Sequence, residues 1–174
     1  MNPEELKALQ APLKEKYRED PASARITLRA TSRLSDGISC KVETGKGLLD
    51  AGLHPATGGN GTQACSGDLL LEALAACAGV TLSAVSTALG AELRDASVHA
   101  EGDLDFRGTL GVSKETPVGF SDIRLRFDLD SDAPKELLEK VISLTERYCV
   151  VFQSLKNSPK LMTEMKMSAP TGNR

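Results

Sequence analysis

The fold is decided by residues 66–89, SGDLLLEALAACAGVTLSAVSTAL. Leucine, alanine and valine occur almost all round a helix drawn through this stretch, so we expect a central, buried helix. Ser66 can cap its start, and Asp68 lies in the first turn, where the helix dipole favours a negative charge. Gly90 is expected to end the helix. The stretch holds a glutamate, several hydroxyl residues and many small residues, which we interpret as too polar for a membrane span.

The residues before this helix predict one helix, a hairpin and a loop. Asn2 to about Glu19 begins with a capping residue and a proline and carries a leucine stripe, so we expect a helix. Residues 25–31 and 38–44 alternate between apolar and polar side chains, as paired strands do, around a turn at 35–37. Residues 45–65 hold six glycines. They predict a long loop of the kind that often carries function.

The residues after the helix predict two further strands and two further helices. Strand-like runs cover 93–106 and 121–130, and a helix should run from Pro134 to about Tyr148. A further turn or short helix should follow over residues 149–156, with a last strand over 161–167. Strands therefore come in pairs separated by helices, which is typical of an α+β fold with largely antiparallel sheet. We divide the chain into a helical extension (1–23), one domain (24–168) and a frayed tail (169–174).

Composition narrows the classes of function. The net charge of −3 leaves no basic excess to neutralise phosphates, which argues against a nucleic-acid partner. The first residues contain neither a basic nor an apolar leader, so we expect a cytoplasmic protein without a membrane partner and with reduced cysteines. The four cysteines contain no Cys-x-x-Cys pair, which disfavours a structural zinc site. We expect no metal and no cofactor.

Two cysteines are candidates for chemistry. Cys77 lies in the middle of the expected central helix among alanines and a glycine, and it is either a small core residue or a thiol beside a small pocket. A thiol there would be inert unless a cation lowered its pKa. Cys149 follows the end of a predicted helix and is either a packing residue or a second thiol. The residues alone do not pair the two.

Several stretches resemble the OsmC/Ohr family. Residues 66–77, SGDLLLEALAAC, resemble its acidic, leucine-rich, Ala-Ala-Cys helix, and residues 146–149, ERYC, resemble its second cysteine motif. The order of the elements also matches, and the resemblance covers roughly residues 24–168. The loop 51–59, leading into residues 65–68, is similar to a particular OsmC-like subgroup rather than to the best-known peroxidases.

The resemblance implies a fold and an activity. Family members are intertwined homodimers in which antiparallel sheets wrap two central helices, and active members are thiol-dependent peroxidases for organic hydroperoxides. It implies that Cys77 attacks the peroxide and that Cys149 resolves the resulting sulfenic acid as a disulfide, which an external thiol then reduces. It further implies an arginine, held by an acid at Asp68, that lowers the pKa of Cys77. Arg33 is favoured for this role, with Arg29 as the alternative.

Some positions depart from the family pattern and leave alternatives open. Val150 follows the second cysteine where active members often have proline, and Ala78 replaces an aromatic residue. His54 in the glycine-rich loop is either a surface histidine or a site residue, and the roles of Cys40 and Cys65 are open. The resemblance as a whole predicts a peroxidase. The alternatives are a non-catalytic dimer that binds a small apolar ligand and a thiol redox sensor.

Overall fold

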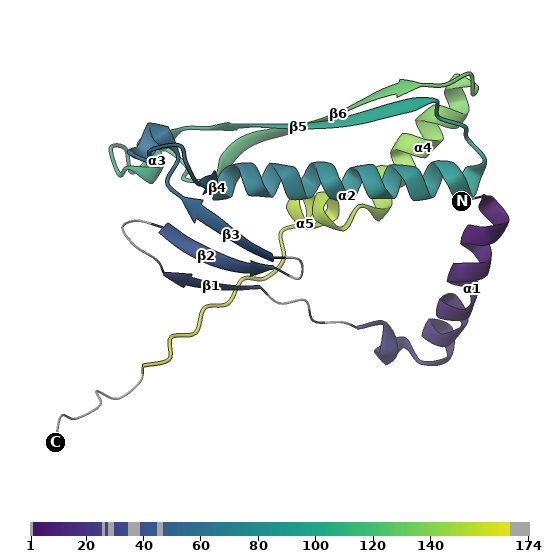
Figure 1. Ribbon diagram of the computed structural model, residues 1–174, viewed down its shortest axis with the longest axis horizontal. Coiled ribbons are helices and arrows are strands. Elements are labelled where there is room, and N and C mark those ends of the chain that lie inside the picture. Colours follow the sequence, from purple (N-terminus) through teal and green to yellow (C-terminus); the bar gives the residue numbers. More distant parts are fainter. Residues whose placement is uncertain (1, 26, 28–29, 35–38, 45–46, 168–174) are drawn as a thin grey trace.

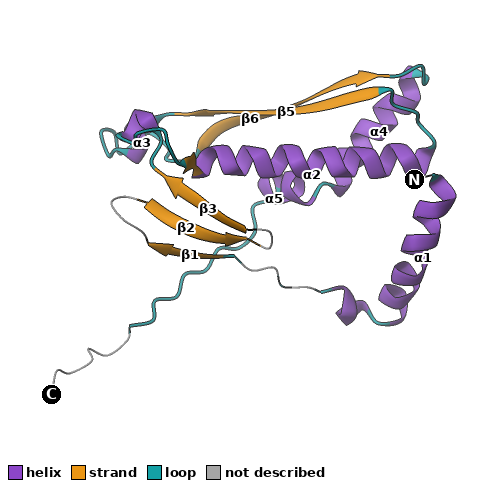
Figure 2. Cartoon of the chain, viewed as in Figure 1, coloured by secondary structure: helices purple, strands orange, loops and turns teal. Residues whose placement is uncertain are grey.

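A computed structural model gives the architecture of the chain (Figure 1). It describes residues 2–25, 27, 30–34, 39–44 and 47–167, and for 31–34 and 39–44 the backbone alone. The α-helices are α1 (Pro3–Glu19), α2 (Ser66–Leu89), α3 (Phe106–Thr109), α4 (Lys135–Tyr148) and α5 (Val150–Lys156), with 3₁₀ turns η1 (Pro21–Ala24) and η2 (Pro55–Thr57). The strands are β1 (Thr31–Leu34), β2 (Ser39–Thr44), β3 (Gly47–Gly52), β4 (Ala64–Cys65), β5 (Asp95–Leu104) and β6 (Phe120–Asp130). Figure 2 shows the long α2 helix between two separate sheets.

The α2 helix runs through the centre of the fold and confirms the predicted helix with its predicted bounds. Its N-cap is Cys65, without a side-chain capping bond, rather than Ser66. Gly90 ends it in the left-handed conformation, with φ at 66°. Glycine adopts that conformation without the steric strain that a Cβ would cause.

Burial of α2 is one-sided, which corrects the expectation of a helix buried all round. The side chains that it buries are Leu74, Ala78, Leu82, Val85 and Ser86. Val80 on another face is 73% exposed. The described residues contain one helix long and apolar enough to cross a membrane, and it is α2, with a mean hydropathy of 1.8. The sequence-based interpretation that this stretch is too polar for a membrane span is therefore wrong. Core helices of soluble proteins meet the same criterion.

Strands β5 and β6 form an antiparallel ribbon over one side of α2, as predicted for residues 93–106 and 121–130. Their register runs from Asp95 opposite Asp130 to Leu104 opposite Phe120. Half-buried and exposed side chains alternate along both strands. The inward side chains pack against the buried residues of α2, so the ribbon and this helix share one core.

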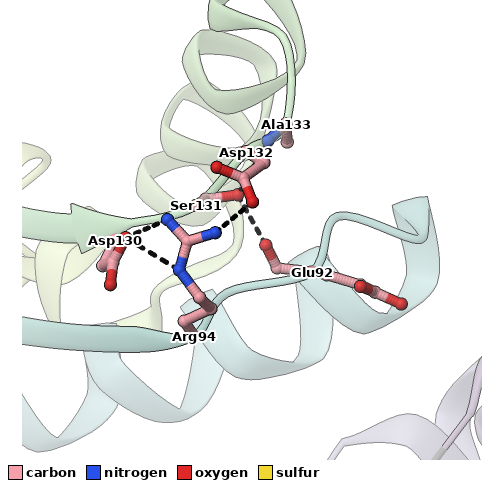
Figure 3. A network of polar contacts seen from close by, with 6 residues as sticks. All are labelled: Glu92, Arg94, Asp130, Ser131, Asp132 and Ala133. Atoms are coloured by element: carbon pink, nitrogen blue, oxygen red, sulfur yellow. Dashed lines mark hydrogen bonds and ion pairs between the residues drawn. The ribbon is translucent and has the colours of Figure 1, made fainter.

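A polar network fastens the far end of this ribbon to the start of α4 (Figure 3). Arg94 pairs with Asp130 and Asp132, which lie on either side of Ser131. The Ser131 hydroxyl donates to the Glu92 carbonyl oxygen and accepts from the Ala133 amide at 3.1 Å. The start of α4 is thereby held beside the end of α2. The two helices pack together through Leu82, Val85 and Val141.

The N-terminal sheet has the order β1-β2-β3-β4. The β1–β2 hairpin is antiparallel, as predicted, but β1 begins at Thr31 rather than at residue 25. The predicted loop over 45–65 is partly wrong because it contains β3, which pairs with β2 over six residues, and the short β4, which joins β3 in parallel. The predicted turn at 35–37 lies outside the described residues.

Both ends of the chain were predicted in part. Helix α1 begins at the predicted N-cap Asn2, which forms a capping box with Glu5, and it contacts α2. Residues 161–167, predicted as a strand, are extended but unpaired and lead away from the body of the fold (Figure 1). Four large apolar side chains there are 80–84% exposed: Leu161, Met162, Met165 and Met167. The predicted tail over 169–174 lies outside the described residues.

Candidate thiol site

The fold brings Cys77 and Cys149 together. Cys77 lies midway along α2, and Cys149 lies at the junction of α4 and α5. Both belong to one apolar cluster that includes the buried Leu74 and Ala78. The cluster is closed by side chains from β5, β6 and α5, among them Val98, Ala100, Ile123, Leu125, Val151 and Phe152. The cysteines are 72 residues apart in sequence, yet they share this apolar cluster and their thiols are hydrogen-bonded to each other.

The helix junction explains the position of Cys149. The residue has an extended backbone (φ −70°, ψ 110°), and its amide donates to the Thr145 carbonyl oxygen at 2.9 Å. Its own carbonyl oxygen accepts from the Gln153 amide at 2.9 Å. Its sulfur caps α5, accepting from the Phe152 amide at 3.5 Å. Cys149 thus ends one helix, begins the next and is fully buried.

The environment of Cys77 favours its thiolate. Burial raises the pKa of Cys77, but hydrogen bonds to its sulfur outweigh this cost, and the pKa lies below its ordinary value. The donors are the backbone amides of Val151 and Val150, the Cys149 thiol and the Thr81 hydroxyl. Val150 can donate because it is not proline, which lacks an amide hydrogen. The departure from the family pattern at this position therefore adds a donor to the site.

The environment of Cys149 favours its protonated thiol. Burial raises the pKa of Cys149, and the adjacent Cys77 sulfur raises it further, while the amides of Phe152 and Val151 act in the opposite direction. The pKa values of the two thiols are thus moved apart. Because the thiolate is the nucleophilic form, these opposite pKa directions favour Cys77 over Cys149 as a nucleophile.

An apolar groove lies next to this cluster. It has a volume of about 530 Å³ between α2, β6 and α5, and Leu74, Ile123, Leu125 and Phe152 line both the groove and the thiol cluster. Lys156 also lines the groove, with its ammonium nitrogen 5.9 Å from the centre of the Phe152 ring. A groove with these walls accommodates an apolar molecule better than a polar one.

The remaining predicted site residues are not assembled around the thiols in the described part of the chain. Asp68 is exposed in the first turn of α2, nine residues or about 14 Å along the axis from Cys77. Arg33 lies on β1 opposite Lys41, and its side chain is outside the described residues. Arg29 is wholly outside them. The roles of Asp68 and of either arginine therefore stay predictions.

The other candidate residues occupy a different region. Cys65 is the N-cap residue of α2, about 18 Å along the helix axis from Cys77. His54 lines the same cavity as Cys65, where its Nδ1 accepts from the Ala56 amide at 3.1 Å and its ring stacks on Phe106. These contacts give His54 a role in ordering its turn. The side chain of Cys40 lies outside the described residues.

Two kinds of hydrogen-bond donor to the Cys77 sulfur were not predicted from the sequence. The amides of Val150 and Val151 are invisible to side-chain patterns, because every residue except proline carries one. Thr81 could have been found, because a hydroxyl four residues after a helical cysteine lies on the same face. No cluster of three metal-ligating side chains occurs among the residues that the structure describes.

The fold and the paired thiols define an α+β protein whose two-cysteine site lies between its central helix and the α4–α5 junction. The family model for OsmC-like protein matches residues 59–164, more than half of the chain, and the chain belongs to this family. No curated protein matches the sequence.

Solved structures share the fold. An OsmC-like protein from Mycoplasma pneumoniae is similar with a TM-score of 0.64 and 16% identity, over 76% of this chain and 89% of that one. An organic hydroperoxide resistance protein from Legionella pneumophila has a TM-score of 0.59 and 19% identity, over 76% and 93%. One from Elizabethkingia anophelis has a TM-score of 0.60 and 16% identity, over 77% and 91%. The predicted OsmC-like fold is confirmed.

Proposed function

We propose that the chain is a thiol-dependent peroxidase that reduces organic hydroperoxides through Cys77 and Cys149. The observation that carries this proposal is the contact between two free thiols whose pKa values move in opposite directions. The family's organic hydroperoxide resistance proteins, at low identity, support the same class of reaction.

The proposed cycle begins at the Cys77 thiolate. Its sulfur attacks the terminal peroxide oxygen, the O–O bond breaks, and the alkoxide leaves as an alcohol after taking a proton. Cys77 becomes a sulfenic acid. The Cys149 sulfur then attacks the Cys77 sulfur, losing its proton, and water leaves as the disulfide forms. Two thiol groups of an external reductant return both cysteines to the reduced form by thiol–disulfide exchange.

The apolar surroundings suit this chemistry. The groove beside Leu74 and Phe152 offers an organic peroxide a place for its carbon chain next to the thiol cluster. The low local dielectric of apolar surroundings strengthens each hydrogen bond to the thiolate. A resolving thiol in contact with Cys77 stops oxidation before the irreversible sulfinic acid forms.

The direct test is intact mass after one equivalent of cumene hydroperoxide, without reductant, followed by peptide mapping. Loss of about two mass units and a linked Cys77–Cys149 peptide is the expected result. Four free thiols at unchanged mass would reject the proposal and favour a ligand-binding role for the groove. A single oxidation without turnover in excess reductant would instead identify a redox sensor.

Arg33 is proposed as an additional activator of Cys77, oriented by Asp68. A guanidinium near the sulfur favours the thiolate without accepting its proton. We expect Arg33→Ala to raise the pKa of Cys77, moving the midpoint of its alkylation rate against pH upward. An unchanged midpoint would exclude Arg33, and the same measurement on Arg29→Ala would then test the alternative.

A homodimer is proposed on the exposed apolar surface. Val80 lies on a face of α2 with Ala73, Ala76 and Ser83, all exposed, and the C-terminal segment adds four exposed apolar side chains. An exposed apolar surface of this kind is typical of an interface with another protein surface. Light scattering should give twice the 18.5 kDa of one chain.

Substitutions at two exposed valines test whether the α2 face forms the dimer interface. Val80→Lys should weaken the dimer, because it places a charge on the surface that the second copy would cover. Val112→Lys is the matched control, since both valines are 73% exposed. A monomeric mass for the unaltered chain at micromolar concentration would contradict the dimer.

A further inference from the structure

Thr81 lies one helical turn after Cys77, on the same side of α2. Side chains four residues apart are neighbours on a helix, and the Cα–Cβ bonds tilt toward its N-terminus. The Thr81 side chain therefore leans back over Cys77. Its hydroxyl donates to the Cys77 carbonyl oxygen at 2.7 Å, and the residue is half-buried.

The hydroxyl of Thr81 has a second acceptor within its reach. Threonine in a helix divides between two χ1 rotamers, because its hydroxyl can bond a carbonyl one turn back. The Cys77 sulfur lies on the same turn, and a hydrogen bond from Thr81 contributes to the lowered pKa of that thiol. The hydroxyl oxygen lies near both acceptors in one side-chain position, so redirecting its hydrogen from the carbonyl oxygen to the sulfur requires rotation about the Cβ–Oγ1 bond only.

We propose that Thr81 is a switching donor to Cys77, bonding its carbonyl oxygen in the thiol state and its sulfur in the thiolate state. No proton is transferred, because the hydroxyl keeps its hydrogen in both positions. The carbonyl oxygen that Thr81 releases still accepts its helical hydrogen bond, so the exchange leaves no buried acceptor without a partner.

The groups that hydrogen-bond the Cys77 sulfur are all neutral, and Thr81 is one of four such donors. Side chains that β5 and β6 place against the thiol cluster are apolar: Val98, Ala100, Ile123, Leu125 and Phe127. From α5 come Val151 and Phe152, with the amides of Val150 and Val151. Cys149 is the titratable side chain that this cluster adds. On the α4 side, Arg147 and Tyr148 line a hollow together with Cys149 and Val150. Neutral donors at close range therefore carry most of the stabilisation that these residues give the thiolate.

The role of Thr81 in turnover rests on the proposed peroxidase function, but its test does not. The rate of Cys77 alkylation by iodoacetamide is measured against pH, with peptide mapping to separate the four cysteines. We expect Thr81→Val, which keeps the shape and removes the hydroxyl, to move the midpoint up by about one pH unit. Alkylation at pH 7 should slow about tenfold. Thr81→Ser, which keeps the hydroxyl, should retain the original midpoint.

Thr87→Val is the matched control. The Thr87 hydroxyl donates to the Ser83 carbonyl oxygen at 2.7 Å, the same bond on the same helix but away from the thiols. Its removal should leave the midpoint unchanged. An unmoved midpoint in Thr81→Val, or an equal rise in Thr81→Ser or Thr87→Val, would overturn the proposal. Peroxide consumption by Cys77→Ser would reject the peroxidase function alone, and the alkylation result would still stand.

Discussion

Cys77→Ser is expected to abolish peroxide consumption. Serine keeps the approximate size of the side chain, but its hydroxyl has no thiolate form near neutral pH and cannot accept the peroxide oxygen as sulfur does. Helix α2 should persist, because the buried residues around Cys77 that hold it are unchanged. Consumption of cumene hydroperoxide with excess dithiothreitol is the measurement. Activity equal to that of the unaltered chain would remove Cys77 from the mechanism.

Cys65→Ser supplies the matched control for this experiment. Cys65 is a free thiol of intermediate exposure that belongs to the same helix as its N-cap, about 18 Å from Cys77 along the axis. Its replacement should leave peroxide consumption unchanged. A loss as large as that in Cys77→Ser would show that thiol content or helix stability, rather than the position of Cys77, determines activity.

Cys149→Ser is expected to allow one oxidation per chain and then over-oxidation. The Cys77 sulfenic acid still forms, but without a resolving sulfur a second peroxide molecule converts it to the sulfinic acid. Intact mass against peroxide dose should therefore show successive oxygen additions instead of the loss of two hydrogens. Sustained turnover in this variant, with Cys77 unmodified, would show that the reductant attacks the sulfenic acid directly and that Cys149 is not required.

The Cys149 experiment needs a separate check on the local fold. The Cys149 sulfur caps α5 through the Phe152 amide, and a serine hydroxyl can accept the same bond with a shorter side chain. Cys149→Ala removes the cap as well as the thiol. Equal over-oxidation in both variants would assign the effect to the missing thiol, whereas over-oxidation confined to Cys149→Ala would assign it to loss of the cap.

Elements with a strong local pattern could be predicted from the sequence. The α2 helix has a long apolar run that ends at Gly90, and the β5–β6 ribbon has alternating side chains, so the bounds of both are predicted close to those observed. Strand β3 was missed because its pairing depends on β2 and its glycine-flanked sequence does not alternate. Residues 161–167 do alternate, yet pattern alone supplies no strand to pair with, and the segment is unpaired in this chain.

The site shows the same division between local and long-range information. Each cysteine was identified as a candidate from its own neighbours, but pairing Cys77 with Cys149 required the family resemblance. The structure places the two together because α4 packs on α2 and ends beside Cys77. The order of their pKa values depends on backbone amides whose directions only the folded junction defines.

The meeting of the thiols at the α4–α5 junction restricts where the length of this chain can change. One residue inserted between Lys135 and Tyr148 would turn everything after it by about 100° and carry Cys149 off the face that meets Cys77. An insertion among residues 110–119, in the exposed connection before β6, would leave both helices in register. Insertions and deletions in α2 or α4 thus change the direction of a cysteine side chain. Insertions in loops outside these two helices leave the contact between Cys77 and Cys149 intact.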